Sequence, residues 1–297
     1  MNFRPESLPD IPHPANPERP ELQRTAEEMV TEKIDALDIG LDVRRHPELR
    51  ARLAEIASHF EDSLVMAKII ERLYGTLKKR LDLTDADPKR LMRAAVLHDI
   101  GKSGPAGAET AAHYAIRRLF IPPRKKFDPF KDGRAQKVSD FVAHQGFMRP
   151  EKLLADLLAA GIAPDQPMLD VWRRHAQWTY DILKPTVNGD IDEKTLYIAA
   201  SHHLLENENP AGLNLMDVPT EAHILEVLEM SELLAAVDKY QALRERGGLK
   251  HEDALTQLEK TVSAKTDLPE SLRSKMRTVI AVLKDSGESL EGLFGKK

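Results

Sequence analysis

The stretch Ala94-Ala95-Val96-Leu97-His98-Asp99-Ile100-Gly101-Lys102 places a histidine and an aspartate side by side at the end of an apolar run. Side chains three and four residues apart share a face of a helix, and the apolar residues before this pair follow that spacing. Asp87-Pro88 provides an N-cap and a first-turn proline, and a glycine follows where a helix commonly stops. We therefore predict a helix over 88–100 whose buried face finishes on His98 and Asp99.

Ionisable side chains interrupt or end apolar faces in four more segments. A buried imidazole or carboxylate without a partner costs several kcal/mol, so these inward polar groups need a common explanation. A shared metal centre supplies one, because a divalent cation satisfies several such groups at once. Glu55 lies four residues before His59 and reaches it if the helical turn between them is continuous. The candidate metal ligands are Glu55, His59, His98, Asp99, His175, His202, His203 and Asp238.

The sequence contains no cysteine, which excludes disulfides, thiolate metal sites and cysteine nucleophiles. A site built from His, Asp and Glu suits iron, manganese or zinc. Polar neighbours predict surface positions for four of the other histidines, His13, His46, His223 and His251. The pattern makes no assignment for His113 and His144.

The 297 residues carry 43 basic and 48 acidic side chains, a net charge of −5, and only 5% aromatic residues. That balance argues against a nucleic-acid clamp. No apolar run approaches the length that spans a membrane, and the N-terminus lacks an apolar signal core. We expect a soluble, cytoplasmic protein, and the sequence leaves its oligomeric state open.

Good helix formers dominate from residue 21 onward and no segment alternates as a β-strand does, which predicts an all-α fold. Six prolines make residues 1–20 an extended arm, and a helical extension over 21–50 precedes a domain over 51–265. An insert at about 103–165 interrupts that domain, and 266–297 form a C-terminal helix and tail. The predicted helices are roughly 21–37, 47–57, 59–80, 88–100, 106–119, 134–145, 150–160, 167–184, 191–204, 220–245, 250–263 and 269–285.

The insert contains a proline-broken segment over 120–133 that predicts a long surface loop. Its basic residues, with those beside it, are Arg117, Arg118, Arg124, Lys125, Lys126, Lys131, Arg134 and Lys137. These residues fit either a solvated loop or a lid that brings cations to a phosphate ligand.

The His-Asp-Ile-Gly-Lys end of the 88–100 helix resembles the signature of the HD superfamily of metal-dependent phosphohydrolases. The later segments are similar to the HD-GYP branch, bacterial phosphodiesterases that act on cyclic di-GMP. Residues 172–183 resemble the segment of its middle histidine, His202-His203 its paired histidines, and 236–243 its closing element. The resemblance spans about residues 50–260 and provides a counterpart for all eight candidate ligands. It implies an HD-domain helical bundle around two divalent ions, with iron favoured and manganese or zinc possible.

Three features depart from that family. Its glutamate after the paired histidines is Leu204 here, its Gly-Tyr-Pro loop is missing, and the gap between Asp99 and His175 is longer. The basic positions after the closing aspartate are rearranged, and the candidates for substrate binding, together with Lys102, are Arg244, Arg246 and Lys250. The comparison therefore predicts a retained metal site with altered substrate-binding parts.

The resemblance implies hydrolysis in which Asp99 bridges the two ions and a metal-activated hydroxide attacks phosphorus, while Lys102 neutralises the phosphoryl oxygens. The expected activity is that of a phosphodiesterase whose substrate is a cyclic dinucleotide (cyclic di-GMP) or a related nucleotide. Lys102 also fits an ordinary solvated lysine at a helix end. Two other interpretations stay open: a catalytically weak nucleotide-binding regulatory module, and a di-iron oxygenase on an HD-type scaffold.

Overall fold

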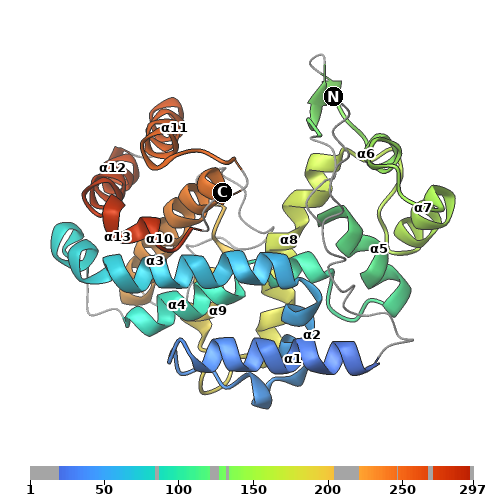
Figure 1. Ribbon diagram of the computed structural model, residues 1–297, viewed down its shortest axis with the longest axis horizontal. Helices are drawn as coiled ribbons and strands as arrows, with labels where there is room; N and C mark the ends of the chain where they lie inside the picture. Colours follow the sequence, from blue (N-terminus) through green and yellow to red (C-terminus); the bar gives the residue numbers. More distant parts are fainter. Residues whose placement is uncertain are drawn as a thin grey trace, which may run out of the picture.

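The computed structural model describes residues 20–83, 87–120, 127–131, 134–203, 221–245, 247–266 and 270–294. Helix follows helix through these ranges, as the all-α prediction requires, and their only sheet is a two-stranded hairpin (Figure 1). Several predictions fall outside the described residues, namely those for residues 1–19 of the arm, His13, Arg124, Lys125, Lys126, Leu204 and Arg246. The predictions for the side chains of Lys131 and His223 also fall outside what is described.

Each predicted helix has a counterpart in the structure. The first part of the chain forms α1 (Pro20–Asp35), the 3-10 turn η1 (Val43–Arg45), α2 (Pro47–Glu55), α3 (Ala57–Leu81), α4 (Pro88–Leu97) and the 3-10 turn η2 (Ile100–Ser103). The insert forms α5 (Thr110–Phe120), the hairpin β1 (Phe130–Lys131) and β2 (Arg134–Ala135), α6 (Val138–Gln145) and α7 (Pro150–Ala159). The remainder forms α8 (Met168–Leu183), η3 (Lys184–Thr186), α9 (Glu193–Ala200), α10 (Glu221–Glu245), α11 (His251–Ala264), α12 (Glu270–Asp285) and α13 (Gly287–Glu291).

Several helix bounds differ from the predicted spans by a few residues, and two of these differences fall at the paired ligands. The helix predicted over 134–145 begins only at Val138, because Arg134 and Ala135 form β2. The N-cap of α4 is as predicted, since the Asp87 side chain accepts from the backbone N–H of Lys89 at 2.9 Å. The helix ends at Leu97, however, and the chain turns into η2, so the predicted span of 88–100 was three residues too long. Likewise α9 ends at Ala200 instead of continuing to 204. The turn after α4 contacts α8 through Gly101 and Thr179, a tertiary contact that helical spacing does not encode.

Two hydrophobic cores lie on either side of α8. The larger is built by α1 to α4 together with α9 to α13, and the smaller by α5, α6, α7 and the first part of α8. In Figure 1 the green helices α5 to α7 gather at one end of the molecule and the red helices α11 to α13 at the other. Met168 and Val171 belong to the smaller core, and Ile182 and Leu183 to the larger. The middle of α8 therefore lies where the two cores meet.

Two of the histidines predicted at the surface are engaged in the interior. His46 is 7% exposed, and its Nε2 lies 3.0 Å from Asp190 Oδ1. His251 is half-buried at the start of α11, where its Nδ1 lies 2.7 Å from the Tyr240 hydroxyl. The surface prediction was wrong for both because their partners are distant along the chain, or on another helix, and polar sequence neighbours do not show them.

Candidate metal centre

Seven of the eight predicted ligands lie together where α3, α4, α8, α9 and α10 meet. One comes from α3, the His-Asp pair follows α4, one lies in the middle of α8, the His-His pair follows α9, and one lies in α10. Two groups have possible ligand atoms within 4.8 Å of one another: His175 with His202 and His203, and His98 with Asp99 and His202. The side chains thus converge from segments about 180 residues apart.

Asp99 lies at the middle of this cluster and is only 4% exposed. Its Oδ1 is 3.3 Å from His175 Nε2 and 3.8 Å from His202 Nε2. Its Oδ2 is 3.5 Å from His98 Nε2 and accepts a hydrogen bond from Lys102 Nζ at 2.5 Å. The two oxygens of one carboxylate therefore face two different sets of side chains, an arrangement that a bridging carboxylate requires.

The buried imidazoles are oriented for cation binding by their own backbone. Each donates Nδ1–H to the carbonyl three residues earlier: His98 to Ala95 at 2.7 Å, His175 to Trp172 at 2.5 Å and His202 to Ala199 at 2.7 Å. That bond fixes the tautomer and leaves the Nε2 lone pair for a ligand.

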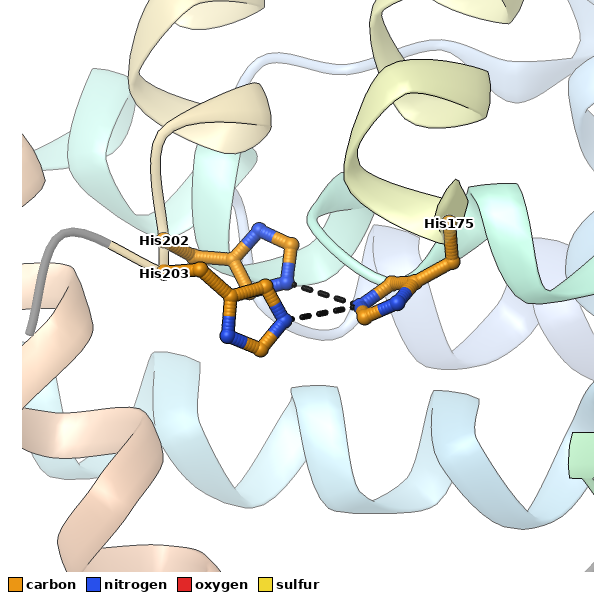
Figure 2. A group of neighbouring side chains, drawn as sticks. All are labelled: His175, His202 and His203. Carbon is orange, nitrogen blue, oxygen red and sulfur yellow. Dashed lines mark hydrogen bonds between the residues drawn. The ribbon is translucent and has the colours of Figure 1, made fainter. Parts of the chain in front are cut away.

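Figure 2 shows His175 on α8 and His202 and His203 after α9, with their rings pointing toward one another. His175 Nε2 lies 3.0 Å from His202 Nε2 and 3.1 Å from His203 Nε2. Two nitrogen lone pairs at such a distance repel each other unless a proton or a metal ion lies between them. The donor set therefore fits a cation bound through these nitrogens.

The protonation states of the buried side chains also fit a bound cation. Burial would raise the pKa of Asp99, but His98 and Lys102 hold it well below its usual value. Burial lowers the pKa of His175 to about 4, and burial with the neighbouring His203 lowers the pKa of His202 well below its usual value. Asp99 is therefore ionised at neutral pH while these two rings are neutral, which is the protonation state that metal binding needs.

His98 differs because it contacts two carboxylates. Burial alone would lower its pKa, but Asp99 and Asp238 outweigh that effect and the pKa is raised. Asp238 Oδ1 lies 3.7 Å from the same Nε2 that faces Asp99. In the absence of a metal a proton on this nitrogen satisfies both carboxylates, and a divalent cation would replace it.

Gly101 permits the close approach that positions the His-Asp pair. A Cβ at this residue would lie 1.9 Å from the carbonyl oxygen of His175 and 2.6 Å from the backbone nitrogen of Thr179. The Gly101 N–H donates to Thr179 Oγ1 at 3.0 Å, and that hydroxyl donates to the His98 carbonyl at 2.8 Å. Two buried hydrogen bonds and one contact thus join η2 to α8 and bring His98 and His175 into the same centre.

Two side chains that support the centre were missed from the sequence. Arg52 in α2 is 5% exposed and donates to Ser103 Oγ at 3.0 Å and to the Gly104 carbonyl at 3.1 Å, which holds the turn after Lys102. Thr179, which joins η2 to α8, is fully buried. Signals existed for both, since Arg52 lies among the buried leucines of α2 and Thr179 follows His175 by four residues on the same helical face.

Lys102 and His59 occupy the side of the cluster nearest Asp99 Oδ2. Lys102 is 7% exposed, which contradicts the interpretation as a solvated helix-end lysine. His59 Nε2 donates to the Phe120 carbonyl at 2.8 Å, and its Nδ1 lies 3.4 Å from Lys102 Nζ and 3.8 Å from Asp99 Oδ2.

Glu55 was expected beside His59, but the continuous turn that this requires is absent. The helix α2 ends at Glu55 and α3 begins at Ala57, with Ile56 between them outside either helix. The Glu55 Oε2 atom is buried and lies 3.7 Å from Arg117 NH1.

Of the substrate-binding residues predicted after Asp238, Arg244 is paired with a carboxylate and Lys250 lies on the surface. Arg244 is 8% exposed and donates to both carboxylate oxygens of Glu291, at 2.8 and 3.0 Å, and to the Tyr240 hydroxyl at 3.2 Å. Lys250 is exposed at the N-cap of α11. A substrate would have to displace Glu291 to reach Arg244.

The described basic residues of the insert are divided between surface and interior. Arg117 is 7% exposed, so the solvated interpretation was wrong for it, and Arg118 lies over the Phe147 ring at 4.6 Å. Arg134 and Lys137 are exposed, in β2 and at the N-cap of α6.

Comparisons with family models, with curated protein sequences and with solved structures return no match. Within the described ranges, every helix is too short or too polar to cross a bilayer.

Proposed function

We propose that this chain is a metal-dependent phosphohydrolase of the HD type that cleaves a phosphodiester, with a cyclic dinucleotide such as cyclic di-GMP, or a related nucleotide, as its substrate. One observation carries the proposal. The two oxygens of the buried Asp99 face two separate sets of imidazoles, with Oδ1 toward His175 and Oδ2 toward His98. A carboxylate in that position is suited to bridging two divalent ions, and paired ions are a common device of phosphodiester hydrolysis.

The ligands divide into two half-sites. The first half-site is Asp99 Oδ1 with His175, His202 and His203, and the second is Asp99 Oδ2 with His98, Asp238 and His59. His202 lies between them, since its ring also neighbours His98. Imidazole and carboxylate ligands suit iron, manganese or zinc. When bound, such ions lower the pKa of water and neutralise charge on phosphoryl oxygens.

The chain's own residues define how a substrate reaches this centre. His98 and Asp99 are almost fully buried, whereas His203 and Asp238 are half-buried, so we expect a substrate to enter on the side of His203 and Asp238. The Lys102 ammonium supplies a positive charge within the cluster, which favours an anionic substrate over a neutral one. His98 and Lys102 keep Asp99 ionised, and its two oxygens lie beside the imidazoles of His98 and His175.

The test compares the wild-type chain with Asp99→Asn, which keeps the size of the side chain and removes its charge. We expect the wild type, loaded with Mn²⁺ or Fe²⁺, to hydrolyse a chromogenic phosphodiester or cyclic di-GMP, and the variant to lose at least about a hundredfold in turnover. His144→Ala is the matched control, because His144 is exposed on α6 and lies outside the cluster. Circular dichroism checks that each variant is folded.

Three outcomes would contradict the proposal. Unchanged turnover in Asp99→Asn would show that the chemistry lies elsewhere. Nucleotide binding by the loaded protein without any product would indicate a regulatory module. Oxygen uptake that depends on a small organic substrate, without phosphate ester cleavage, would indicate an oxygenase.

A further inference from the structure

Lys102 Nζ lies between two ligand atoms of the second half-site. It donates to Asp99 Oδ2 at 2.5 Å and lies 3.4 Å from His59 Nδ1. Because His59 donates its Nε2–H to the Phe120 carbonyl, its Nδ1 carries a lone pair and accepts from the ammonium. The ammonium thus contacts a carboxylate oxygen and an imidazole nitrogen that a divalent ion would otherwise use.

A second cation of the chain engages the remaining ligand that the resemblance assigned to this region. Glu55 Oε2 lies 3.7 Å from Arg117 NH1, and both side chains are largely buried. Arg117 belongs to α5 of the insert, so the insert itself supplies the counter-charge for Glu55.

The first half-site has a different composition. Asp99 Oδ1 faces the Nε2 atoms of His175 and His202, and each of these rings donates Nδ1–H to the backbone carbonyl three residues earlier. Here nitrogen lone pairs face each other at 3.0 Å and require a cation or a proton. The two halves of the cluster therefore differ in how their charge is balanced.

We propose that the Lys102 ammonium is a built-in cation of the second half-site, so that the chain binds one divalent ion tightly at His175, His202 and His203 and a second only when Lys102 leaves Asp99. This inference rests on the proposed metal centre. It assigns Lys102 a positioning and gating role in metal loading, in addition to any contact with substrate. The second ion binds weakly because it must displace a like charge from the same carboxylate.

The test is a Mn²⁺ titration of the chelator-treated full chain by equilibrium dialysis, with electron paramagnetic resonance to detect spin coupling between paired ions. In the wild type we expect one ion per chain, and a second with a dissociation constant at least about tenfold higher. Lys102→Met, which keeps the length of the side chain and removes its charge, should lower the second dissociation constant about tenfold or more and give coupled spectra at lower Mn²⁺. Lys89→Met is the control, because Lys89 forms an exposed pair with Asp38 at 2.9 Å.

The outcomes separate this inference from the proposed function. No Mn²⁺ bound by either protein would overturn the metal centre and the inference with it. Two ions of equal affinity in the wild type, unchanged in Lys102→Met, would overturn the inference and leave the metal centre intact. If Lys102→Met does not fold, the wild type still decides: in a Zn²⁺ titration followed by lysine Nζ nuclear magnetic resonance, the Lys102 signal should change in the second binding step, and a change in the first step would refute the proposal.

Discussion

Replacing Gly101 by alanine tests whether the contact between η2 and α8 builds the centre. The added Cβ would lie 1.9 Å from the His175 carbonyl oxygen and 2.6 Å from the Thr179 nitrogen, both of which are backbone atoms that cannot rotate away. The turn that carries Asp99 must therefore move away from α8.

The cost follows from what that movement breaks. The Gly101 to Thr179 and Thr179 to His98 hydrogen bonds are both buried, and their loss together costs about 2 kcal/mol. Forcing an extra carbon into a packed contact adds about 1–3 kcal/mol. We therefore expect Gly101→Ala to lower the free energy of unfolding by about 3–5 kcal/mol. Its affinity for Mn²⁺ should fall by at least about tenfold, because His98 and His175 no longer face one centre.

Urea unfolding followed by tryptophan fluorescence is the suitable assay, because both tryptophans of the chain, Trp172 and Trp178, lie on α8. Gly75→Ala is the matched control. Gly75 lies within α3, and a Cβ added there would meet no atom within 4 Å, so alanine should stabilise the chain by about 0.5–1 kcal/mol. A free energy of unfolding for Gly101→Ala within about 1 kcal/mol of the wild type, with unchanged Mn²⁺ affinity, would refute the reasoning.

Three further predictions concern charge and metal. Burial beside Glu229 raises the pKa of Glu232 to about 7 despite Lys275, so the folded chain retains a proton that the unfolded chain releases near 4.5. Stability should fall by up to about 3 kcal/mol as the pH rises between these values, and urea unfolding at several pH values should show that Glu232→Gln lacks this decrease. Burial would raise the pKa of Asp190, but its hydrogen bond to His46 lowers it below 3.8. The ionised Asp190 therefore stabilises the fold above pH 3.8, and this contribution is lost as the pH falls through the lower folded-state pKa. Asp190→Asn should lower the free energy of unfolding by about 1–3 kcal/mol at neutral pH but by little in acid. Treatment with a chelator should lower the melting temperature, with recovery on adding Mn²⁺, and an unchanged melting temperature would contradict a bound structural or catalytic ion.

The sequence predicted the helices because apolar spacing is a local property. The N-cap at Asp87 and the proline after it fixed the start of α4. The hairpin β1–β2 was not predicted, because two-residue strands carry too little pattern to recognise. The separate core of the insert was also not predicted. Apolar residues such as Phe141 and Trp172 indicate burial, but the sequence does not show which core they join.

The candidate ligands were predicted as polar residues on apolar helix faces. Such faces pack against one another in the core, so their polar residues can meet there. What the sequence could not show was pairing between distant charges. Glu55 pairs with Arg117, and His46 with Asp190, across 62 and 144 positions of the chain. Composition near each residue is the same whether or not such a partner exists, so neither the contact of Glu55 with Arg117 nor the burial of His46 could be predicted.

The two ligand doublets explain why helix ends matter in this fold. Consecutive residues of a continuous α-helix point about 100° apart, so a tighter turn after the first residue changes the direction of the second relative to a helix. Here His98 still has helical backbone angles, whereas Asp99, with φ −96° and ψ 4°, begins the tighter η2 turn, and both side chains reach the cluster. His202 and His203 likewise follow the end of α9, beyond Ser201 at its C-cap. Both doublets therefore lie at early helix ends that the sequence did not predict, and the contact of Gly101 with α8 positions the first of them.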